Sequence, residues 1–185
     1  SALIDQMASR LGFERRDAGP TTILEGARGH YRATVEVTRR GEEGHLRFFQ
    51  RIRIDTPSPA APEAIAVSPP SDSRGVRLNE PIFDASAEVA GPEDAVVALF
   101  GPAVRTAIVG HGGHWTIGPS GLEWSARRAP TYLSATAEVL FDLARDFCEA
   151  SADLPGALVA RVEQDPVLGV RLRALQVLLQ HGGDD

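Results

Sequence analysis

The chain has 185 residues, of which 43% are hydrophobic and 24% charged, so it is long enough to bury one ordinary core with a small appendage. Its formal net charge of −6 offers no overall positive field for a phosphate backbone, so nucleic acid is not expected as a partner. Its single cysteine excludes an internal disulfide and favours a cytoplasmic location, and no apolar run approaches the roughly 20 residues of a membrane span, so no membrane partner is expected either.

The first segment predicts a short amphipathic helix. Apolar residues recur at steps of three and four over residues 2–11, and Gly12 stops the pattern. The chain then breaks at Gly19-Pro20 before a run of strands. The apolar stripe of the helix consists of Leu3, Ile4, Met7, Ala8 and Leu11.

The next region predicts an antiparallel hairpin with one face in water. Apolar and polar residues alternate over 31–38 and again over 46–54, and the turn 41–44 joins the two runs. Phe49 and Gln50 fall out of phase with this alternation. We therefore expect a bulge or an irregular pairing at these two residues.

Arginine is concentrated on the solvent side of this hairpin. The six residues concerned are Arg32, Arg39, Arg40, Arg47, Arg51 and Arg53. Their simplest role is edge protection and cross-strand pairing with the acidic residues of the same region, which are Glu36, Glu42 and Glu43. The alternative is a site for an acidic partner, a phosphate-bearing ligand or RNA, although the run lacks the interleaved aromatic residues of single-strand binders. The candidate partner-binding residues are Arg47, Arg51 and Arg53.

A segment rich in proline, residues 57–75, interrupts the strand pattern. Since proline cannot join a central ladder, this segment predicts a connection between two halves, 1–56 and 76–150, of one α+β domain. Short strands at 65–67 and 76–78 fit the remaining apolar residues.

Residues 83–148 carry the clearest local signals and predict, in order, a strand, a helix, a tight hairpin and a long helix. The strand covers 83–89, and the first helix is interrupted at Gly101-Pro102. A glycine-proline turn then pairs Trp115 with Trp124 on one sheet face, either for packing or as a binding platform.

The long helix of this unit, residues 133–148, has the strongest helical periodicity in the chain. Its apolar stripe predicts burial against the hairpin and the neighbouring strands. Cys148 lies on this stripe and is expected to act as a small buried hydrophobe. The whole pattern predicts an α+β fold, with a mostly antiparallel sheet that carries helices on one face and a helical hairpin at the C-terminal end.

The last segment, residues 151–185, predicts a pair of helices over 154–162 and 165–180. The second helix follows the pattern D-P-x-x-x-V-R-x-x-A-x-x-x-L, in the residues Asp165, Pro166, Val170, Arg171, Ala174 and Leu178. This pattern resembles the second helix of HEAT-like repeats. The resemblance implies that Asp165 caps the helix and that Arg171 pairs with a neighbouring repeat.

The first 150 residues resemble a domain of uncharacterised bacterial proteins that sometimes precedes HEAT-like repeats. The likeness lies in the GARGHYRATVEV segment, in Phe83-Asp84 and in the hairpin before the long helix. This resemblance implies an α+β fold, and it points to no catalytic residue in this chain. A solitary HEAT-like repeat must dock on other structure, because a solenoid needs about three repeats to be stable.

The second C-terminal helix is apolar over more than one stripe, so we expect it to make an intermolecular contact. Its apolar residues are Val167, Leu168, Val170, Leu172, Leu175, Val177, Leu178 and Leu179. Val177 points away from Leu175 and Leu179, and together with Arg171 it is the candidate for a partner-facing position. The main domain, a second copy of the chain or another protein could cover this surface.

One stretch suggests a reactive site, the segment His111-Gly112-Gly113-His114. Its two imidazoles could hold a metal, but no third ligand is nearby in the sequence and the glycines leave the pair unorganised. The chain has no phosphate-binding loop and no nucleophile elbow. We therefore expect no cofactor, and a non-catalytic scaffold or protein-interaction module. The alternatives are a metal-dependent hydrolase that uses His111 and His114, and a binder of anionic ligands that uses the arginine-rich hairpin.

Overall fold

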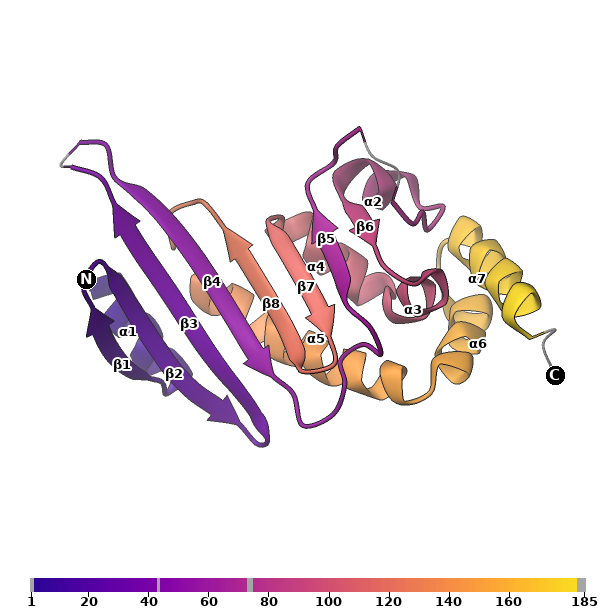
Figure 1. Ribbon diagram of the computed structural model, residues 1–185, viewed down its shortest axis with the longest axis horizontal. Helices are drawn as coiled ribbons and strands as arrows, with labels where there is room; N and C mark the ends of the chain where they lie inside the picture. The colour runs from indigo at the N-terminus through magenta and orange to yellow at the C-terminus, as the bar shows by residue number, and fades with distance from the viewer. Residues whose placement is uncertain (1, 43, 73–74, 183–185) are drawn as a thin grey trace.

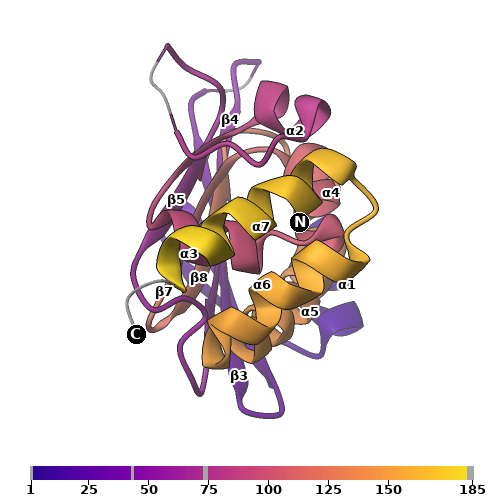
Figure 2. The same ribbon diagram turned by 90° about the vertical axis from the view of Figure 1, so that its right-hand side faces the viewer.

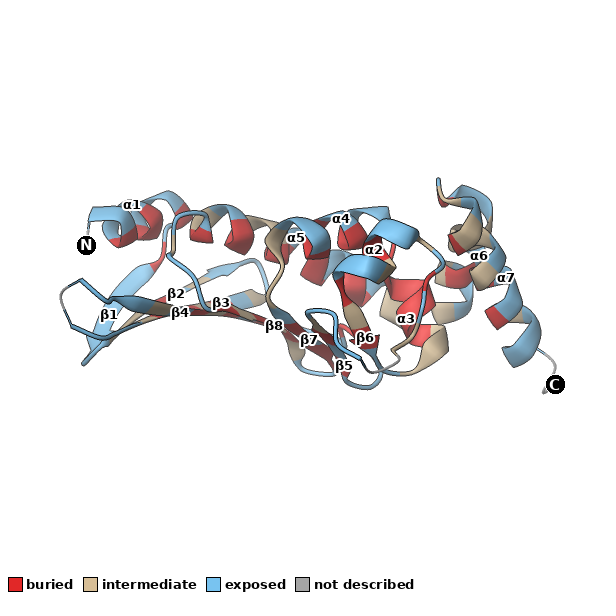
Figure 3. Cartoon of the chain, turned by 90° about the horizontal axis from the view of Figure 1, so that it is seen from above, coloured by how far each residue is buried: buried red, intermediate tan, exposed pale blue. Residues whose placement is uncertain are grey.

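The computed structural model describes residues 2–42, 44–72 and 75–182, and it contains one antiparallel sheet with helices on one face (Figure 1). The order across the eight-stranded sheet is β1-β2-β3-β4-β8-β7-β5-β6. Figure 3 shows the helices above the sheet and an exposed sheet face below. The expected α+β architecture is therefore confirmed.

The element boundaries follow the expected alternation of strand-rich and helix-rich regions. The strands are β1 (Glu14–Ala18), β2 (Thr21–Arg28), β3 (Tyr31–Arg40), β4 (Arg47–Asp55), β5 (Ile65–Ser68), β6 (Glu88–Ala90), β7 (His114–Gly118) and β8 (Gly121–Ala126). The helices are α1 (Ala2–Leu11), α2 (Pro81–Ser86), α3 (Glu93–Leu99), α4 (Pro102–His111), α5 (Leu133–Ala152), α6 (Leu154–Gln164) and α7 (Leu168–His181). Within the described ranges, no helix has both the length and the apolar character needed to cross a membrane.

The N-terminal helix α1 and the edge strand β1 begin the fold. α1 ends as the sequence predicts, where Gly12 adopts a φ of +68°. The sequence of β1 does not alternate between apolar and polar residues, and all five of its residues are exposed. It is a strand because it pairs with β2 along its whole length. Its charged side chains suit an outer edge strand, since charge discourages pairing with other chains.

The β3–β4 hairpin pairs without interruption, so the expected bulge at Phe49 and Gln50 is wrong. Gln50 occupies a core position and its side-chain amide donates to the carbonyl oxygen of Arg128. Phe49 lies on the opposite face of the sheet and is exposed. The break in the sequence alternation therefore reflects a buried polar residue with its hydrogen bond satisfied and an exposed apolar neighbour.

The proline-rich segment does not divide the sheet. The short strand expected at 65–67 is present as β5, which lies between β7 and β6, while residues 73–74 are outside the described part of the chain. β4 from the first half pairs with β8 from the second, so both halves share one sheet. The strand expected at 76–78 is wrong. Val76 donates its backbone N–H to the Val89 carbonyl oxygen of β6 at 2.7 Å, but the backbone N–H of Leu78 donates to the Asp84 carboxylate at 3.0 Å, and the segment forms no ladder.

The strand expected over 83–89 is also wrong. The chain forms the short helix α2 first, and the strand beyond it, β6, has only three residues. The Glu80 carboxylate accepts a hydrogen bond of 2.7 Å from the backbone N–H of Phe83, and a proline occupies the first helical turn. Both features favour a helix start over a strand.

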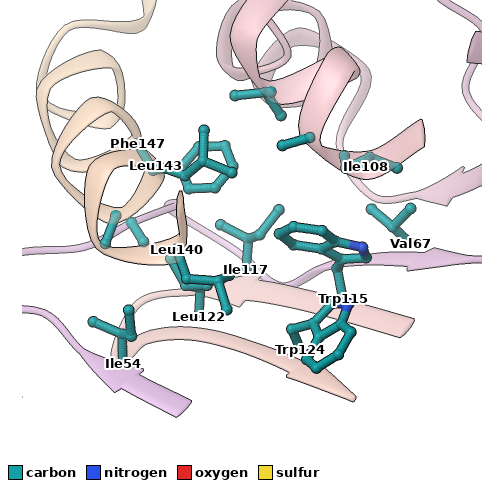
Figure 4. Packing of buried hydrophobic residues seen from close by; sticks show 14 of the residues in the cluster. Ile54, Val67, Ile108, Trp115, Ile117, Leu122, Trp124, Leu140, Leu143 and Phe147 are labelled. Carbon is teal, nitrogen blue, oxygen red and sulfur yellow. The ribbon is translucent and has the colours of Figure 1, made fainter. Parts of the chain in front are cut away.

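The two tryptophans lie in the core between the sheet and its helices. Trp115 pairs with Trp124 across β7 and β8, as the sequence predicts. Figure 4 shows the two indoles on the same side of the sheet as Leu140 and Phe147 of α5. Their side chains are 1% and 0% exposed, so packing is their role and the binding-platform alternative is wrong.

The helical hairpin expected near the C-terminus is formed by α6 and α7, at the end of the molecule farthest from β1 (Figures 1 and 2). Both helices pack against α3. Asp165 lies in the bend between them, and its carboxylate accepts a hydrogen bond of 3.0 Å from the backbone N–H of Val167. Since Val167 is itself the N-cap residue of α7, Asp165 stabilises the bend before the helix and does not occupy the cap position.

Candidate functional site

The segment from His111 to His114 is organised by the tryptophan pair. His111 is the last residue of α4 and His114 the first of β7, with a two-glycine turn between them. The indole N–H groups of Trp115 and Trp124 both donate to the carbonyl oxygen of Gly112, each at 2.9 Å. The turn therefore supplies the one acceptor that two buried indoles need.

The two imidazoles of this segment lie in different surroundings. His111 is half-buried, and its Nδ1 is 3.0 Å from the Thr136 hydroxyl of α5. His114 is exposed and pairs in register with Ser125 of β8. Among the residues that the structure describes, no three side chains of the His, Cys, Asp or Glu types are grouped to hold a metal ion. Among the described residues, the alternative of a metal-dependent hydrolase therefore has no third metal ligand beside His111 and His114.

Stability should depend on pH through His111. Burial, and secondarily the neighbouring Arg128 guanidinium, lower the pKa of this imidazole. The neutral form is therefore favoured in the folded chain, and this contribution is complete above the unfolded pKa of about 6.5 and is lost as pH falls from there toward the folded value. We expect His111→Gln to reduce the loss of stability between about pH 7.5 and about pH 5, measured by urea unfolding. Equal pH slopes in the wild type and in His111→Gln would contradict the assignment.

The arginine-rich hairpin is partly neutralised by its own acidic residues. Arg51 of β4 contacts the Glu36 carboxylate of β3 at 2.6 Å, and Arg53 contacts Asp55 at 2.9 Å. Both pairs are partly exposed, so each contributes at most about 1 kcal/mol. The expectation that all six arginines share one face is wrong for Arg39, because the strand register places it on the opposite face.

The end of the hairpin near the turn differs from its middle. Arg40 and Arg47 lie directly opposite one another in the β3–β4 ladder. Glu42 is exposed in the adjacent turn, and Glu43 is outside the described residues. Of the three candidate arginines, Arg51 and Arg53 therefore have carboxylate partners, whereas Arg47 faces another arginine.

A buried ion pair joins α4 to the bend between α6 and α7. Both terminal nitrogens of Arg105 donate to the Asp165 carboxylate at 2.9 Å, and one of them also donates to the Phe100 carbonyl oxygen. Arg161 lies 3.4 Å from the same carboxylate. Burial alone would raise the pKa of Asp165, but the hydrogen bonds from Arg105 and from the Val167 backbone outweigh it and lower the pKa. This pair anchors the helical hairpin to the rest of the chain.

Helix α7 is apolar on two opposite faces. Its inner face carries the small buried side chains of Val170, Ala174 and Val177, directed toward the α3 side. Its outer face carries a row of leucines, which we call the leucine stripe. These residues, with exposed fractions of 59%, 57%, 41% and 73%, are Leu168, Leu172, Leu175 and Leu179.

Val177 is 0% exposed, so the expectation that it faces a partner is wrong. Val177 does lie opposite Leu175 and Leu179 on the helix, as the spacing predicts, but the leucines face solvent and the valine faces the core. Small side chains on the inner face allow a close approach. A Cβ atom added at Gly169 would lie 2.2 Å from the carbonyl oxygen of Asn79, which shows how closely α7 meets the segment before α2.

Arg171 lies at the side of α7 between the two faces. Its Nε is buried and has no hydrogen-bond partner within the described part of the chain. The neighbouring Arg173 differs, because it contacts the Glu93 carboxylate and donates to the Arg77 carbonyl oxygen at 3.1 Å. Arg171 therefore places a positive charge beside the leucine stripe.

Comparison of the chain with protein-family models, curated proteins and solved structures found no match. Two surfaces among the described residues stand out: the exposed leucine stripe, and the end of the arginine-rich hairpin where Arg40 lies opposite Arg47.

Proposed function

We propose that the protein is a non-catalytic interaction module whose helix α7 binds an amphipathic helix of a partner protein. The observation that carries this proposal is the exposed leucine stripe, whose members follow one another at steps of four, three and four residues. This is the spacing at which one helix packs against another. Single exposed leucines are ordinary on a protein surface, but four along one side of one helix form a continuous apolar surface.

The leucine stripe lies on a helix that is held in place before any partner binds. The inner face of α7 is buried, the Arg105–Asp165 pair fixes the bend at its start, and Arg173 ties its middle to Glu93 of α3. A preorganised surface loses little conformational entropy on binding. This arrangement favours a docking role for α7, in agreement with the use of HEAT-like helices as binding surfaces.

Charge favours a partner helix with acidic residues beside its apolar stripe over a second copy of the chain. α7 carries Arg171 and Arg173 but no aspartate or glutamate. Arg171 lies beside the leucine stripe, so its positive charge would attract a partner carboxylate. A second α7 would bring only further arginines to the same contact.

The test is a double variant of the leucine stripe, Leu172→Asp with Leu179→Asp. Since both side chains are exposed, we expect stability to change by less than about 0.5 kcal/mol per site. Binding of a dye-labelled helical peptide with leucine at heptad spacing and glutamate beside it should weaken by about tenfold or more. Fluorescence anisotropy measures this binding. Ile82→Asp is the matched control, because Ile82 is an exposed apolar residue of a different helix.

Three results would count against the proposal. The wild-type chain could show no saturable binding of the peptide, or it could bind the same peptide with lysine in place of glutamate equally well. The third is a dimer in sedimentation velocity that the double variant abolishes, which would assign the leucine stripe to a second copy of the chain.

A further inference from the structure

A surface hollow lies where β4 begins and β8 ends, away from α7. Its volume is about 720 Å³, which is large enough for a few residues of an extended peptide. The side chains that determine its character are two exposed apolar residues and four arginines, namely Leu46, Phe49, Arg40, Arg47, Arg127 and Arg128. We call this feature the arginine hollow.

One wall of the arginine hollow is an open strand edge. β8 ends at Ala126, opposite Gln50, so residues 47–49 of β4 pair with β3 on one side and have no ladder partner among the described strands on the other. Figure 1 shows β4 extending past the end of β8, where the chain turns away toward α5. An edge of this kind presents unpaired backbone donors and acceptors to a second chain.

The backbone groups available at this edge can be assigned to one residue. Thr56, directly after β4, donates its N–H toward the β8 side, to the Ser120 carbonyl oxygen at 3.2 Å. Alternate residues of a strand direct their backbone groups to alternate neighbours. The N–H and C=O of Phe48 therefore face the same side as those of Thr56, which at this end of the strand is the arginine hollow.

The charge of the arginine hollow is of one sign. Among the described residues that line it there is no carboxylate, and Arg40 and Arg47 are directly opposite in the ladder. Like charges in directly opposite positions disfavour pairing of the strands, so an anion that bridges them would be bound favourably. The matching arginines farther along β4, Arg51 and Arg53, already have carboxylate partners.

The far wall of the arginine hollow is held in place. The Arg128 guanidinium lies 5.2 Å from the ring centre of Trp124, and its carbonyl oxygen accepts from the buried Gln50 side chain. Both contacts fix the chain after β8 at a set separation from β4. The gap is therefore a standing feature of the fold and needs no rearrangement to admit a ligand.

We propose that the arginine hollow binds an extended acidic peptide segment of another protein, which pairs with the edge of β4 beside Phe48. The free backbone edge selects an extended peptide, since a small anion or a lipid surface would leave those groups unpaired. The positive charge of Arg40, Arg47 and Arg127 favours carboxylates, and the exposed side chains of Leu46 and Phe49 favour apolar neighbours. The recognised sequence therefore combines acidic and apolar residues.

The experiment measures binding of a short fluorescein-labelled peptide of alternating glutamate and valine by anisotropy. Arg47→Glu combined with Arg127→Glu is expected to weaken binding by about tenfold or more, since each arginine forms a charge-assisted contact. Arg32→Glu is the matched control, because this exposed arginine is on the same hairpin but at the far end of β3. Circular dichroism and thermal unfolding establish that each variant keeps the wild-type fold.

A peptide in which proline replaces the central valine tests the strand pairing, because proline cannot donate to a ladder. Weaker binding of the proline peptide and of a lysine–valine peptide supports the proposal. The proposal is overturned if the glutamate–valine peptide does not saturate, if the Arg47→Glu and Arg127→Glu changes leave its affinity unchanged, or if the proline peptide binds equally well. Full displacement by inorganic pyrophosphate or by phosphatidylserine vesicles at low concentration would also overturn it, by assigning the arginine hollow to a small anion or a membrane.

Discussion

Arg105→Ala is expected to destabilise the chain by about 3–5 kcal/mol, because it leaves the Asp165 carboxylate buried without its main partner. In the wild type, two hydrogen bonds of 2.9 Å join the side chains, which are 6% and 0% exposed. Urea unfolding followed by circular dichroism measures the loss. Arg161→Ala is the control, since Arg161 reaches the same carboxylate only at 3.4 Å and should cost less.

The pH dependence and a double variant separate the ion pair from simple loss of packing. The folded pKa of Asp165 is lowered, so its stabilising contribution is present above the unfolded pKa of about 3.9 and is lost as pH falls through the folded value. The difference between Arg105→Ala and wild type should therefore be largest at neutral pH and shrink in acid. Arg105→Met combined with Asp165→Leu should recover much of the stability, because an apolar pair needs no desolvation of charge. Additive losses in the double variant would rule out a direct ion-pair contribution.

Val177→Glu should destabilise the fold by about 3 kcal/mol or more, because it places a carboxylate at a position that is 0% exposed and packed toward α3. No arginine or lysine is on the inner face of α7, which carries Val170 and Ala174. The glutamate would therefore either be buried unpaired or separate α7 from the sheet domain. Thermal and urea unfolding report the loss, and sedimentation velocity reports any expansion of the chain.

Leu179→Glu is the matched control for Val177→Glu, since it makes the same kind of change two residues further along the same helix. Leu179 is 73% exposed, so the effect on stability should stay within about 0.5 kcal/mol. Similar stability of the two variants would show that the inner and outer faces of α7 have been assigned wrongly. That result would also remove the basis for docking on the leucine stripe.

The leucine stripe and the arginine hollow lie in different parts of the molecule, with the core of the sheet between them (Figure 1). If both proposals are correct, a partner helix and an acidic peptide can be bound at the same time. Such an arrangement is that of a connector between two proteins, or between two segments of one protein.

Several features of this protein follow from the sequence alone. The turn chemistry between β7 and β8 determined that Trp115 pairs with Trp124, because a short loop with glycine at the turn leaves one register. The period of 3.6 residues determined α1, α5 and the helical hairpin, and strict alternation determined β3. These elements are determined by local interactions, because each depends only on residues that are close together in the chain.

Contacts between distant residues decided the rest. Gln50 is buried because its hydrogen-bond acceptor at Arg128 comes from a segment far along the chain, and Arg105 meets Asp165 only once α4 lies beside the helical hairpin. α7 has two apolar faces, and the helical period gives the angle between them but not which one is buried. Packing of α7 against α3 decided that the small residues face inward and the leucines face solvent. The arginine hollow likewise exists because β8 is shorter than β4, a difference that the pairing of strands from separate parts of the chain determines and that no local pattern in either strand contains.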